Sequence, residues 1–241
     1  LLDTSVIDIG YYSYSWTRLF FNVVCGAVVP TVLPILYSFR RCPYAMRARM
    51  TLLYASIDLE LREVLLKAKP EKMLAISAKG TVPVLELPNA EVLDESYDII
   101  RWALRQSDPQ NWLSADLGSA ISDLIERNDG QFKTDLDHYK YWERFPAESQ
   151  GEYRLRGEQF LAELEVLLSR QSYLLAERIT LADIALFPFV RQFAFVDKDW
   201  FDQSPYPKLR AWLEQLLNSK LFLAAMKKSP PWQDGDSPIS L

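Results

Sequence analysis

The alternation of apolar and polar positions divides the chain after residue 33 into two regions with different periodicities. In the first region, short apolar or alternating runs typical of strands are separated by segments with helical spacing. Strands are predicted at residues 35–39, 59–65, 82–87 and 91–93. Helices are predicted at residues 43–56, 70–77 and 95–105. The predicted order of elements is therefore βαβαββα.

The second region begins after a polar Asp-Pro-Gln-Asn linker at residues 108–111 and carries only helical periodicity. Helices are predicted at residues 116–139, 149–169, 180–195, 206–218 and 220–227. Thr180 and Asp183 are spaced as a capping box at the start of one of these helices, which is a folding signal and not a catalytic one. The tail, residues 229–241, is polar and rich in proline, so we expect it to be non-helical.

These patterns predict four parts. Residues 34–107 form a small α/β domain and residues 108–228 an all-helical domain, which the tail follows. Residues 1–33 are expected to be an extension outside the core fold, because their apolar run is too short and interrupted for a membrane span and they lack the basic region of a signal peptide. Two interpretations of the extension stay open. It is an upstream translation or processing artefact, since the chain starts with Leu1, or a membrane-associating or partner-binding arm.

Composition limits the possible function classes. Of the 241 residues, 49% are apolar and 24% are charged, as in ordinary soluble globular proteins. The net charge of −5 and the pI near 5.1 argue against a nucleic-acid partner, which normally requires a basic face. Two cysteines cannot form a disulfide framework. The single histidine, His138, cannot build a His-rich site, so we expect no metal cofactor.

Cys42 lies where a predicted strand ends and a predicted helix begins. Pro43 favours the first helical position, which places Cys42 at the N-cap, facing free backbone N–H groups. Helix N-termini and nearby cations lower the pKa of a thiol. We therefore expect a lowered pKa for Cys42, with positive charge from Arg40, Arg41 and Arg47. The alternative is a small buried apolar residue, the usual environment of a free cysteine.

The Cys42 site has one thiol only. Ala45 occupies the position where a Cys-X-X-Cys motif would carry its second cysteine, and Cys25 is the only other cysteine in the chain. A monothiol of this kind needs an external thiol to resolve a mixed disulfide. Glutathione is the obvious candidate for that thiol.

Several motifs occur together in a specific order. They are Cys42-Pro43-Tyr44-Ala45 followed by Arg47, the pair Val82-Pro83, the pair Glu95-Ser96, and Thr180-x-x-Asp183. Over about residues 34–227 the chain resembles the glutathione S-transferases, most closely their cysteine-type, Omega-like branch. The resemblance implies an α/β thioredoxin-like N-terminal domain followed by an all-α helical bundle. It also implies a homodimer, in which the first domain of one subunit meets the helices of the other.

The same resemblance implies roles in binding glutathione as a cosubstrate. Pro83 is expected to be cis, which exposes the Val82 backbone for pairing with the cysteinyl part of the peptide. Ser96 at a helix N-terminus suits the γ-glutamyl carboxylate, Glu95 suits its ammonium group, and Lys69 would meet the glycyl carboxylate. Each has a plainer alternative: Pro83 is an edge-strand proline, Ser96 and Glu95 belong to a helix cap, and Lys69 is an exposed lysine.

The pocket for a second substrate is expected between the two domains. Its candidate residues are Tyr44, His138 and Tyr141, because aromatic and amphipathic side chains suit apolar ligands. Helix packing or simple surface exposure is the alternative for each of them. His138 and its neighbours in the same helix, Tyr139 to Trp142, cannot all face one pocket.

Three functions stay open at this point. The leading hypothesis is a cytoplasmic enzyme that transfers or reduces thiols on a small disulfide or electrophile through a glutathione mixed disulfide at Cys42. The second is conjugation of glutathione to small apolar electrophiles, for which a cysteine is a poor hydrogen-bond donor. The third is a non-catalytic, transferase-like scaffold or regulatory protein. We expect no membrane association for the core fold, and the physiological substrate is not determined by these motifs.

Overall fold

The chain divides into two compact units, Leu1–Val32 and Leu33–Leu241. The structure, a computed structural model, describes residues 21–24, 27–30 and 32–241. In the first unit, β1 (Phe21–Val24) and β2 (Ala27–Pro30) pair in antiparallel fashion. The expectations for residues 1–20 lie outside the described residues, and the interpretation of the N-terminal segment as an extension stays a prediction.

The second unit is built on a mixed five-stranded sheet with the order β6-β5-β3-β4-β7. Its strands are β3 (Ile35–Ser38), β4 (Glu60–Glu63), β5 (Val84–Glu86), β6 (Val92–Leu93) and β7 (Ile239–Ser240). β3 and β4 are parallel, and the other neighbours are antiparallel. The four strands predicted for the α/β domain are therefore confirmed, and the fifth comes from the C-terminal tail.

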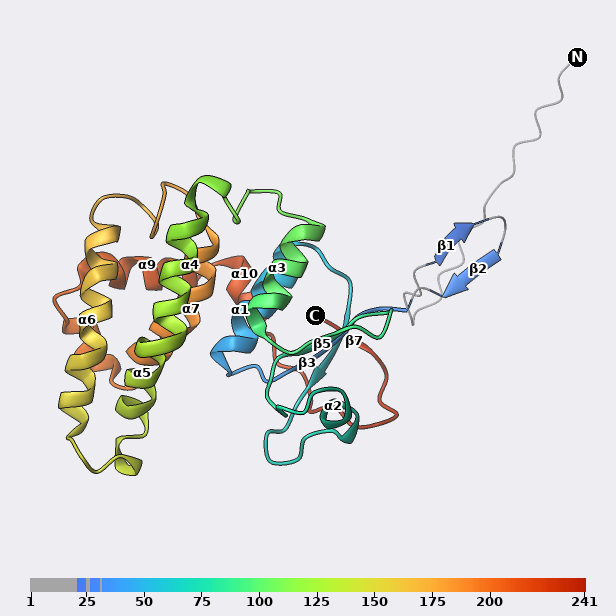
Figure 1. The fold of residues 1–241 in the computed structure, drawn as a ribbon, viewed down its shortest axis with the longest axis horizontal. Helices are drawn as coiled ribbons and strands as arrows, with labels where there is room; N and C mark the ends of the chain where they lie inside the picture. The colour runs from blue at the N-terminus through green and yellow to red at the C-terminus, as the bar shows by residue number, and fades with distance from the viewer. Residues whose placement is uncertain (1–20, 25–26, 31) are drawn as a thin grey trace, which may run out of the picture. The chain divides into compact units, whose positions relative to one another are not determined.

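Helices cover both faces of this sheet (Figure 1). They are α1 (Pro43–Tyr54), α2 (Glu71–Ile76) and α3 (Ser96–Gln106). Successive strand residues point to opposite faces, so Leu36 of β3 packs with α1 and α3 while Tyr37 packs with Met73 of α2. The α1 helix ends where Ser56 adopts a positive φ of 55°. This arrangement confirms the predicted thioredoxin-like order.

The rest of the second unit is a helical bundle that packs against α1 (Figure 1). Its elements are η1 (Ala115–Leu117), α4 (Gly118–Arg127), the π-helix η2 (Asn128–Phe132), α5 (Lys133–Lys140), η3 (Trp142–Arg144), α6 (Gln150–Leu168), α7 (Leu181–Ala194), α8 (Lys198–Gln203), α9 (Pro207–Leu217) and α10 (Lys220–Ala225). Met46 and Met50 of α1 belong to the same core as α7, so the two domains share one buried apolar cluster. The predicted all-α second domain is confirmed.

Asp183 anchors the start of α7. Its carboxylate accepts from the Thr180 N–H at 2.8 Å, from the Leu174 N–H at 3.0 Å and from the Trp212 indole at 2.9 Å. The capping box predicted for Thr180 and Asp183 is present. Burial raises the pKa of Asp183, and these donors satisfy its oxygens, so its role is structural.

The C-terminal tail returns to the α/β domain. It is non-helical, as predicted, but it is not a free polar segment: β7 pairs with β4, with Ile239 opposite Leu61. The Trp232 N–H donates to the Glu63 carbonyl at 2.8 Å, and the Arg62 guanidinium lies 4.3 Å from the Trp232 ring centroid. These contacts cover the edge of β4 that would otherwise expose unpaired backbone groups.

None of the helices in the described part of the chain is long and apolar enough to cross a membrane.

Candidate functional site

Cys42 is the N-cap residue of α1. Its backbone is extended, with φ −77° and ψ 125°, and Pro43 occupies the first turn of the helix, as the sequence predicts. The Cys42 N–H donates to the Phe39 carbonyl at 2.9 Å, and its own carbonyl accepts from the Met46 N–H at 2.9 Å. The half-buried thiol donates to the Val82 carbonyl, with 3.6 Å between sulfur and oxygen. The strand-to-helix turn thus aims the sulfur at the loop before β5.

The expectation of a lowered Cys42 pKa is wrong for this structure. Burial raises the pKa of the Cys42 thiol, because a thiolate is poorly solvated there. The N–H groups of Ala45 and Tyr44 and the charges of Lys133 and Arg47 act in the opposite direction but do not outweigh burial. The helix N-terminus contributes as predicted, and desolvation dominates.

Two of the expected cations serve other partners. The Arg40 backbone N–H donates to Glu63 Oε1 at 2.8 Å, and its guanidinium reaches the Met226 carbonyl at 3.4 Å. The Arg41 guanidinium lies over the Phe39 ring, 5.5 Å from the centroid. The positive charge acting on the thiol therefore comes from within α1 and from the helical domain.

The Val82–Pro83 peptide bond is cis, which confirms the expectation from the family resemblance. It lies at the wall of a cavity of about 420 Å³ that adjoins the Cys42 turn. The residues lining this cavity are Tyr44, Lys79, Thr81, Val82, Pro83, Asp94, Glu95, Ser96 and Asp129. Four of the predicted glutathione-binding residues, Val82, Pro83, Glu95 and Ser96, are thus brought together, and the cavity is called the peptide cavity below.

Arg47 lies behind the peptide cavity and bonds two of its lining residues. The Arg47 side chain is 2% exposed. Its guanidinium donates to the Ser96 hydroxyl and, through two nitrogens, to both carboxylate oxygens of Asp129. The Nη2–Oδ2 distance is 2.6 Å, so the pair is a bidentate ion bridge between the two domains. Ser96 is also the first residue of α3, where free backbone N–H groups favour an anion.

Lys79 also lines the peptide cavity. It bonds Glu95 at 2.5 Å and Asp94 at 3.2 Å, and Asp94 also accepts from the Ser77 hydroxyl at 2.9 Å. The hydrogen bond that Lys79 donates to Glu95 raises the pKa of Lys79, with the bond to Asp94 as a further cause. The Glu95 carboxylate is therefore already paired, so an incoming ammonium group has to share it with Lys79.

A second cavity, of about 430 Å³, has Cys42 itself in its lining and is called the front cavity below. It is lined by Phe39, Arg41, Cys42, Pro43, Tyr44, Leu66, Lys133, Asp137, Lys140, Tyr141 and Gln192. Both domains contribute to it, as expected for a second-substrate pocket. Tyr44 lines both cavities, and its ring packs edge-on against Phe189 at 4.8 Å. Tyr44 and Tyr141 thus line a cavity between the domains, and their role in binding a second substrate stays a prediction.

Two other candidates lie elsewhere. His138 is absent from the front-cavity lining, because its ring packs against Phe145 at 4.2 Å and Tyr153 at 5.0 Å on another face of α5. Lys69 lines neither cavity; its Nζ lies 4.0 Å from the position that a Cβ on Gly80 would take. The structure therefore places neither side chain beside Cys42 or Ser96.

Sequence reasoning missed Asp129, Lys79 and Lys133. Asp129 belongs to the π-helix η2, which interrupts the helix predicted at residues 116–139. A π-turn changes the direction of the following side chains, and such turns are frequent at functional sites. Helical periodicity gives no signal for this π-turn. A regular helix over the same residues would place Asp129 and the residues that follow it on different faces.

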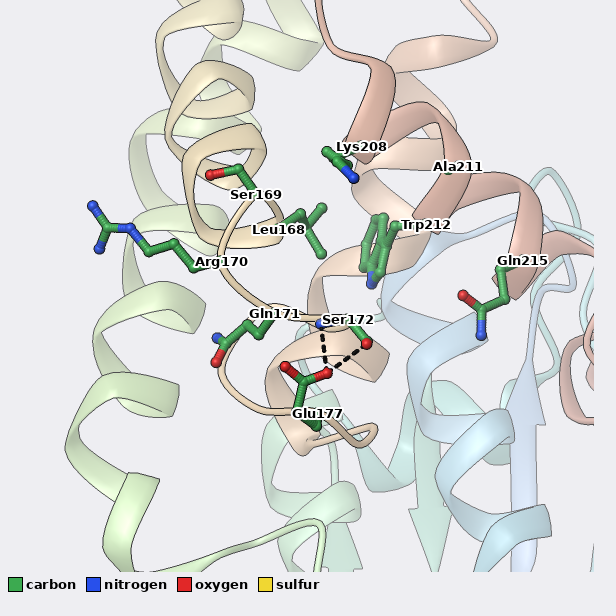
Figure 2. A pocket seen from close by; sticks show the side chains of 10 residues that line it. All are labelled: Leu168, Ser169, Arg170, Gln171, Ser172, Glu177, Lys208, Ala211, Trp212 and Gln215. Atoms are coloured by element: carbon green, nitrogen blue, oxygen red, sulfur yellow. Dashed lines mark hydrogen bonds between the residues drawn. The ribbon is translucent and has the colours of Figure 1, made fainter.

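A third cavity, of about 310 Å³, lies between the end of α6 and α9 (Figure 2). It shares no lining residue with the other two. Glu177 accepts hydrogen bonds from the N–H and the hydroxyl of Ser172, and Trp212 also lines the cavity. No cluster of three or more metal-ligating His, Cys, Asp or Glu side chains occurs within residues 32–241 or the described part of the first unit.

Comparison with known proteins defines the class to which this fold and site belong. The family model of the glutathione S-transferase N-terminal domain matches residues 36–112, and that of the C-terminal domain matches residues 149–215. Together they cover more than half of the chain. The chain belongs to the glutathione S-transferase family.

Individual relatives are distant. "Glutathione S-transferase U28" of Arabidopsis thaliana is 26% identical over 211 residues, covering 81% of this chain and 89% of the relative. "Pyrimidodiazepine synthase" of Drosophila melanogaster is 28% identical over 204 residues, covering 78% of this chain and 79% of the relative. The solved structure of glutathione transferase Omega 3C from Trametes versicolor has a TM-score of 0.70 at 20% identity, covering 83% of this chain and 91% of the other. The predicted family and fold class are thus confirmed.

Proposed function

We propose that this protein binds glutathione in the peptide cavity and exchanges thiols through a mixed disulfide at Cys42, as an Omega-like transferase. The observation that carries the proposal is the position of the Cys42 sulfur. It contacts the carbonyl of Val82, which lines the peptide cavity, while Cys42 itself lines the front cavity. A bound peptide thiol and a second substrate therefore meet at one sulfur atom.

The peptide cavity offers a binding group for each part of the γ-glutamyl-cysteinyl backbone. The Ser96 hydroxyl and the N-terminus of α3 suit the γ-glutamyl carboxylate. Glu95 and Asp129 suit its ammonium group, and the cis Val82–Pro83 segment suits antiparallel pairing with the cysteinyl residue. Lys69 as the partner of the glycyl carboxylate stays a prediction.

The proposed reaction conserves thiols and disulfides. The Cys42 thiolate attacks the glutathionyl sulfur of a mixed disulfide, the S–S bond breaks, and the departing thiolate takes up a proton. The thiolate of a second glutathione then attacks the sulfur bonded to Cys42, which releases glutathione disulfide and restores the Cys42 thiolate. In this proposal the cysteinyl N–H of glutathione pairs with the Val82 carbonyl, so the Cys42 thiol loses the acceptor that favours its protonated form.

The test is glutathione-dependent reduction of the mixed disulfide of glutathione and 2-mercaptoethanol, with dehydroascorbate as a second substrate. Cys42→Ser is expected to lose at least about a hundredfold in kcat/KM, because a hydroxyl cannot form the intermediate. Cys25→Ser is the matched control and is expected to retain activity. Equal activity of the wild type and Cys42→Ser would refute the cysteine mechanism.

Conjugation of glutathione to an apolar electrophile is the second candidate, and one observation favours it. Burial raises the pKa of Cys42 and so favours its S–H form, which can donate to the sulfur of bound glutathione. This reading predicts that Cys42→Ser, whose hydroxyl can donate in place of the S–H group, retains conjugation of glutathione to 1-chloro-2,4-dinitrobenzene. The thiol-transfer proposal predicts loss of disulfide reduction in the same variant.

The remaining expectations belong to the same proposal. A non-catalytic scaffold is disfavoured by the assembled peptide cavity; it would be supported if the protein failed both to bind glutathione-agarose and to reduce a glutathione mixed disulfide. The homodimer and the cytoplasmic location stay predictions. Light scattering of the purified protein measures the first, and fractionation of cells expressing the tagged chain measures the second.

A further inference from the structure

The front cavity is more positively charged than the rest of the protein. Arg41, Lys133 and Lys140 line it together with a single carboxylate, Asp137. The chain as a whole has a net charge of −5. A local excess of one sign in a cleft raises the concentration of ligands of the opposite sign, so the charge of this cavity bears directly on which substrates reach the sulfur.

The positive charges are not equally balanced. Lys133 forms an ion pair with Asp137. Arg41 and Lys140 have no carboxylate within ion-pair distance in the part of the second unit that the structure describes. Instead Arg41 lies over the Phe39 ring, and the Lys140 ammonium lies 4.9 Å from the Tyr141 ring centroid. Two cations at the mouth of the cavity are therefore available to an incoming anion.

We propose that the front cavity selects disulfides whose departing half carries a carboxylate, with Arg41 and Lys140 as the specificity-determining residues. The proposal deepens the thiol-transfer function above and rests on it. The two cations attract the carboxylate of the substrate. They also stabilise the negative charge that develops on the departing sulfur as the S–S bond breaks, an effect that is largest in the transition state.

The chemical step is the thiol–disulfide exchange described above. The glutathionyl half of the disulfide is assigned to the peptide cavity, and the departing half is assigned to the front cavity. The Cys42 thiolate bonds to the glutathionyl sulfur held in the peptide cavity, and the bond to the carboxylate-bearing thiol breaks. That thiolate leaves into the front cavity and is protonated from solvent. A second glutathione supplies the thiol that regenerates Cys42 and leaves as glutathione disulfide.

An apolar substrate is the competing outcome. Phe39, Leu66 and Tyr141 supply apolar surface in the same cavity. Small apolar electrophiles are the substrates that such aromatic residues predict. A cavity governed by these side chains would bind a neutral disulfide as well as a charged one of similar size, and the experiment below separates the two cases.

The experiment measures one stoichiometric exchange without glutathione. A Cys25→Ser background leaves Cys42 as the only thiol. Its second-order rate constant is measured with 5,5′-dithiobis(2-nitrobenzoate), which carries two carboxylates, and with neutral 2,2′-dithiodipyridine. Each constant is divided by that of free 2-mercaptoethanol, an uncharged thiol, with the same reagent at the same pH. The normalised ratio of anionic to neutral reagent is expected to be at least about ten at low salt, and to fall in 1 M NaCl, where the screening length is about 3 Å.

Charge-removing variants locate the effect. Arg41→Gln and Lys140→Gln are each expected to lower the ratio severalfold, and the double variant to bring it close to one. Lys208→Gln removes the same charge beside the separate cavity of Figure 2 and is expected to leave the ratio unchanged. All of these side chains are at least partly exposed, and thermal melting confirms that the variants are folded. The proposal is overturned if the normalised ratio in the Cys25→Ser protein is one or less. It is also overturned if the double variant leaves that ratio unchanged.

The two proposals fail separately. Absence of glutathione-dependent turnover, with the anionic preference intact in the stoichiometric exchange, would reject thiol transfer as the function while keeping the selectivity of the cavity. Turnover that depends on Cys42 but shows equal kcat/KM for glutathione mixed disulfides of 3-mercaptopropionate and 2-mercaptoethanol would reject the selectivity and keep the function.

Discussion

The Arg47 guanidinium holds the Ser96 hydroxyl through two hydrogen bonds, from Nε at 3.1 Å and from Nη2 at 2.9 Å. A hydroxyl has two acceptor lone pairs and one proton to donate. Arg47 occupies both lone pairs of the Ser96 oxygen, so the hydroxyl can take part in a further hydrogen bond only as a donor. Because Ser96 lines the peptide cavity, that donor is available to a ligand bound there. The buried arginine thereby presets Ser96 as a hydrogen-bond donor for a bound carboxylate.

Asp129 supplies the charge that balances Arg47 inside the protein. Asp129→Asn is expected to lower the free energy of unfolding by roughly 3 kcal/mol, because it leaves a buried guanidinium without its counter-charge. Removing one partner of a buried ion pair usually costs about 3–5 kcal/mol. We expect the lower end of that range, because the Asp129 side chain is 28% exposed. Asp123→Asn, which disrupts an exposed pair with Arg127, is the control and should cost less than about 1 kcal/mol. Urea unfolding measures both, and equal losses would contradict a special role for the Arg47 pair.

The raised pKa of Cys42 predicts a specific pH dependence. In a Cys25→Ser background, alkylation of Cys42 by iodoacetamide should reach half of its maximal rate above the ordinary thiol value of about 8.5. Lys133→Gln should move this midpoint higher, because it removes a charge that lowers the pKa. A midpoint below 8 in the resting protein would show that the helix N-terminus outweighs burial.

The same shift links the thiol to stability. A raised pKa in the folded state means that folding favours the protonated thiol, so its contribution is fully present below the unfolded value of about 8.5. It is lost as pH rises from there through the folded value. Cys42→Ser should therefore flatten the decline of unfolding free energy at alkaline pH, measured by urea titration at several pH values.

Trp232 attaches the C-terminal tail to the α/β domain. Its ring meets Tyr37 edge-on at 6.3 Å and lies under the Arg62 guanidinium. Trp232→Ala is expected to cost about 2 kcal/mol, less than for a fully buried tryptophan, and to lower Tm by roughly 4–8 °C. Trp142→Ala, at a tryptophan that is 40% exposed, is the control and should change Tm by much less. If the two variants have the same Tm, the contacts of Trp232 do not contribute to the stability of the fold.

Gly157 marks a close approach of two helices. A Cβ at this position of α6 would overlap the Phe193 ring of α7, with Cζ at 3.1 Å. Gly157→Ala should therefore destabilise the protein by roughly 1–3 kcal/mol through overpacking. Gly151→Ala lies in the same helix with no heavy atom closer than 3.9 Å, and should be neutral or stabilising by about 0.5–1 kcal/mol. Thermal unfolding that ranks the two variants in the opposite order would contradict this packing.

Most elements of the fold could be predicted from local patterns. The helix that begins at Pro43 and the strands before and after it agree with the prediction to within a few residues. Patterns failed where long-range contacts decide the conformation. β7 has only two residues and exists because the edge of β4 offers backbone partners, and the π-helix η2 interrupts an otherwise regular helical sequence. The short helix α8 was also missed.

The candidate site was predictable in its chemistry and less so in its geometry. Cys42, Val82, Pro83, Glu95 and Ser96 were identified from motifs, and the structure gathers them around one turn. His138 was chosen for its residue type, but a single helix cannot aim every polar or aromatic side chain at one cavity.

The sequence alone determined that one thiol without a local partner stands at the start of a helix, because Ala45 and Pro43 are local facts. Only the tertiary structure decided the pKa of that thiol. Cys42 packs against a cluster that includes Tyr37, Val64 and Val82, and this burial raises the Cys42 pKa against the pull of the helix N-terminus. Tertiary packing also brought Arg47, Ser96 and Asp129 together from three separate elements. Desolvation and ion pairing depend on distances between segments far apart in the chain, which no local pattern encodes.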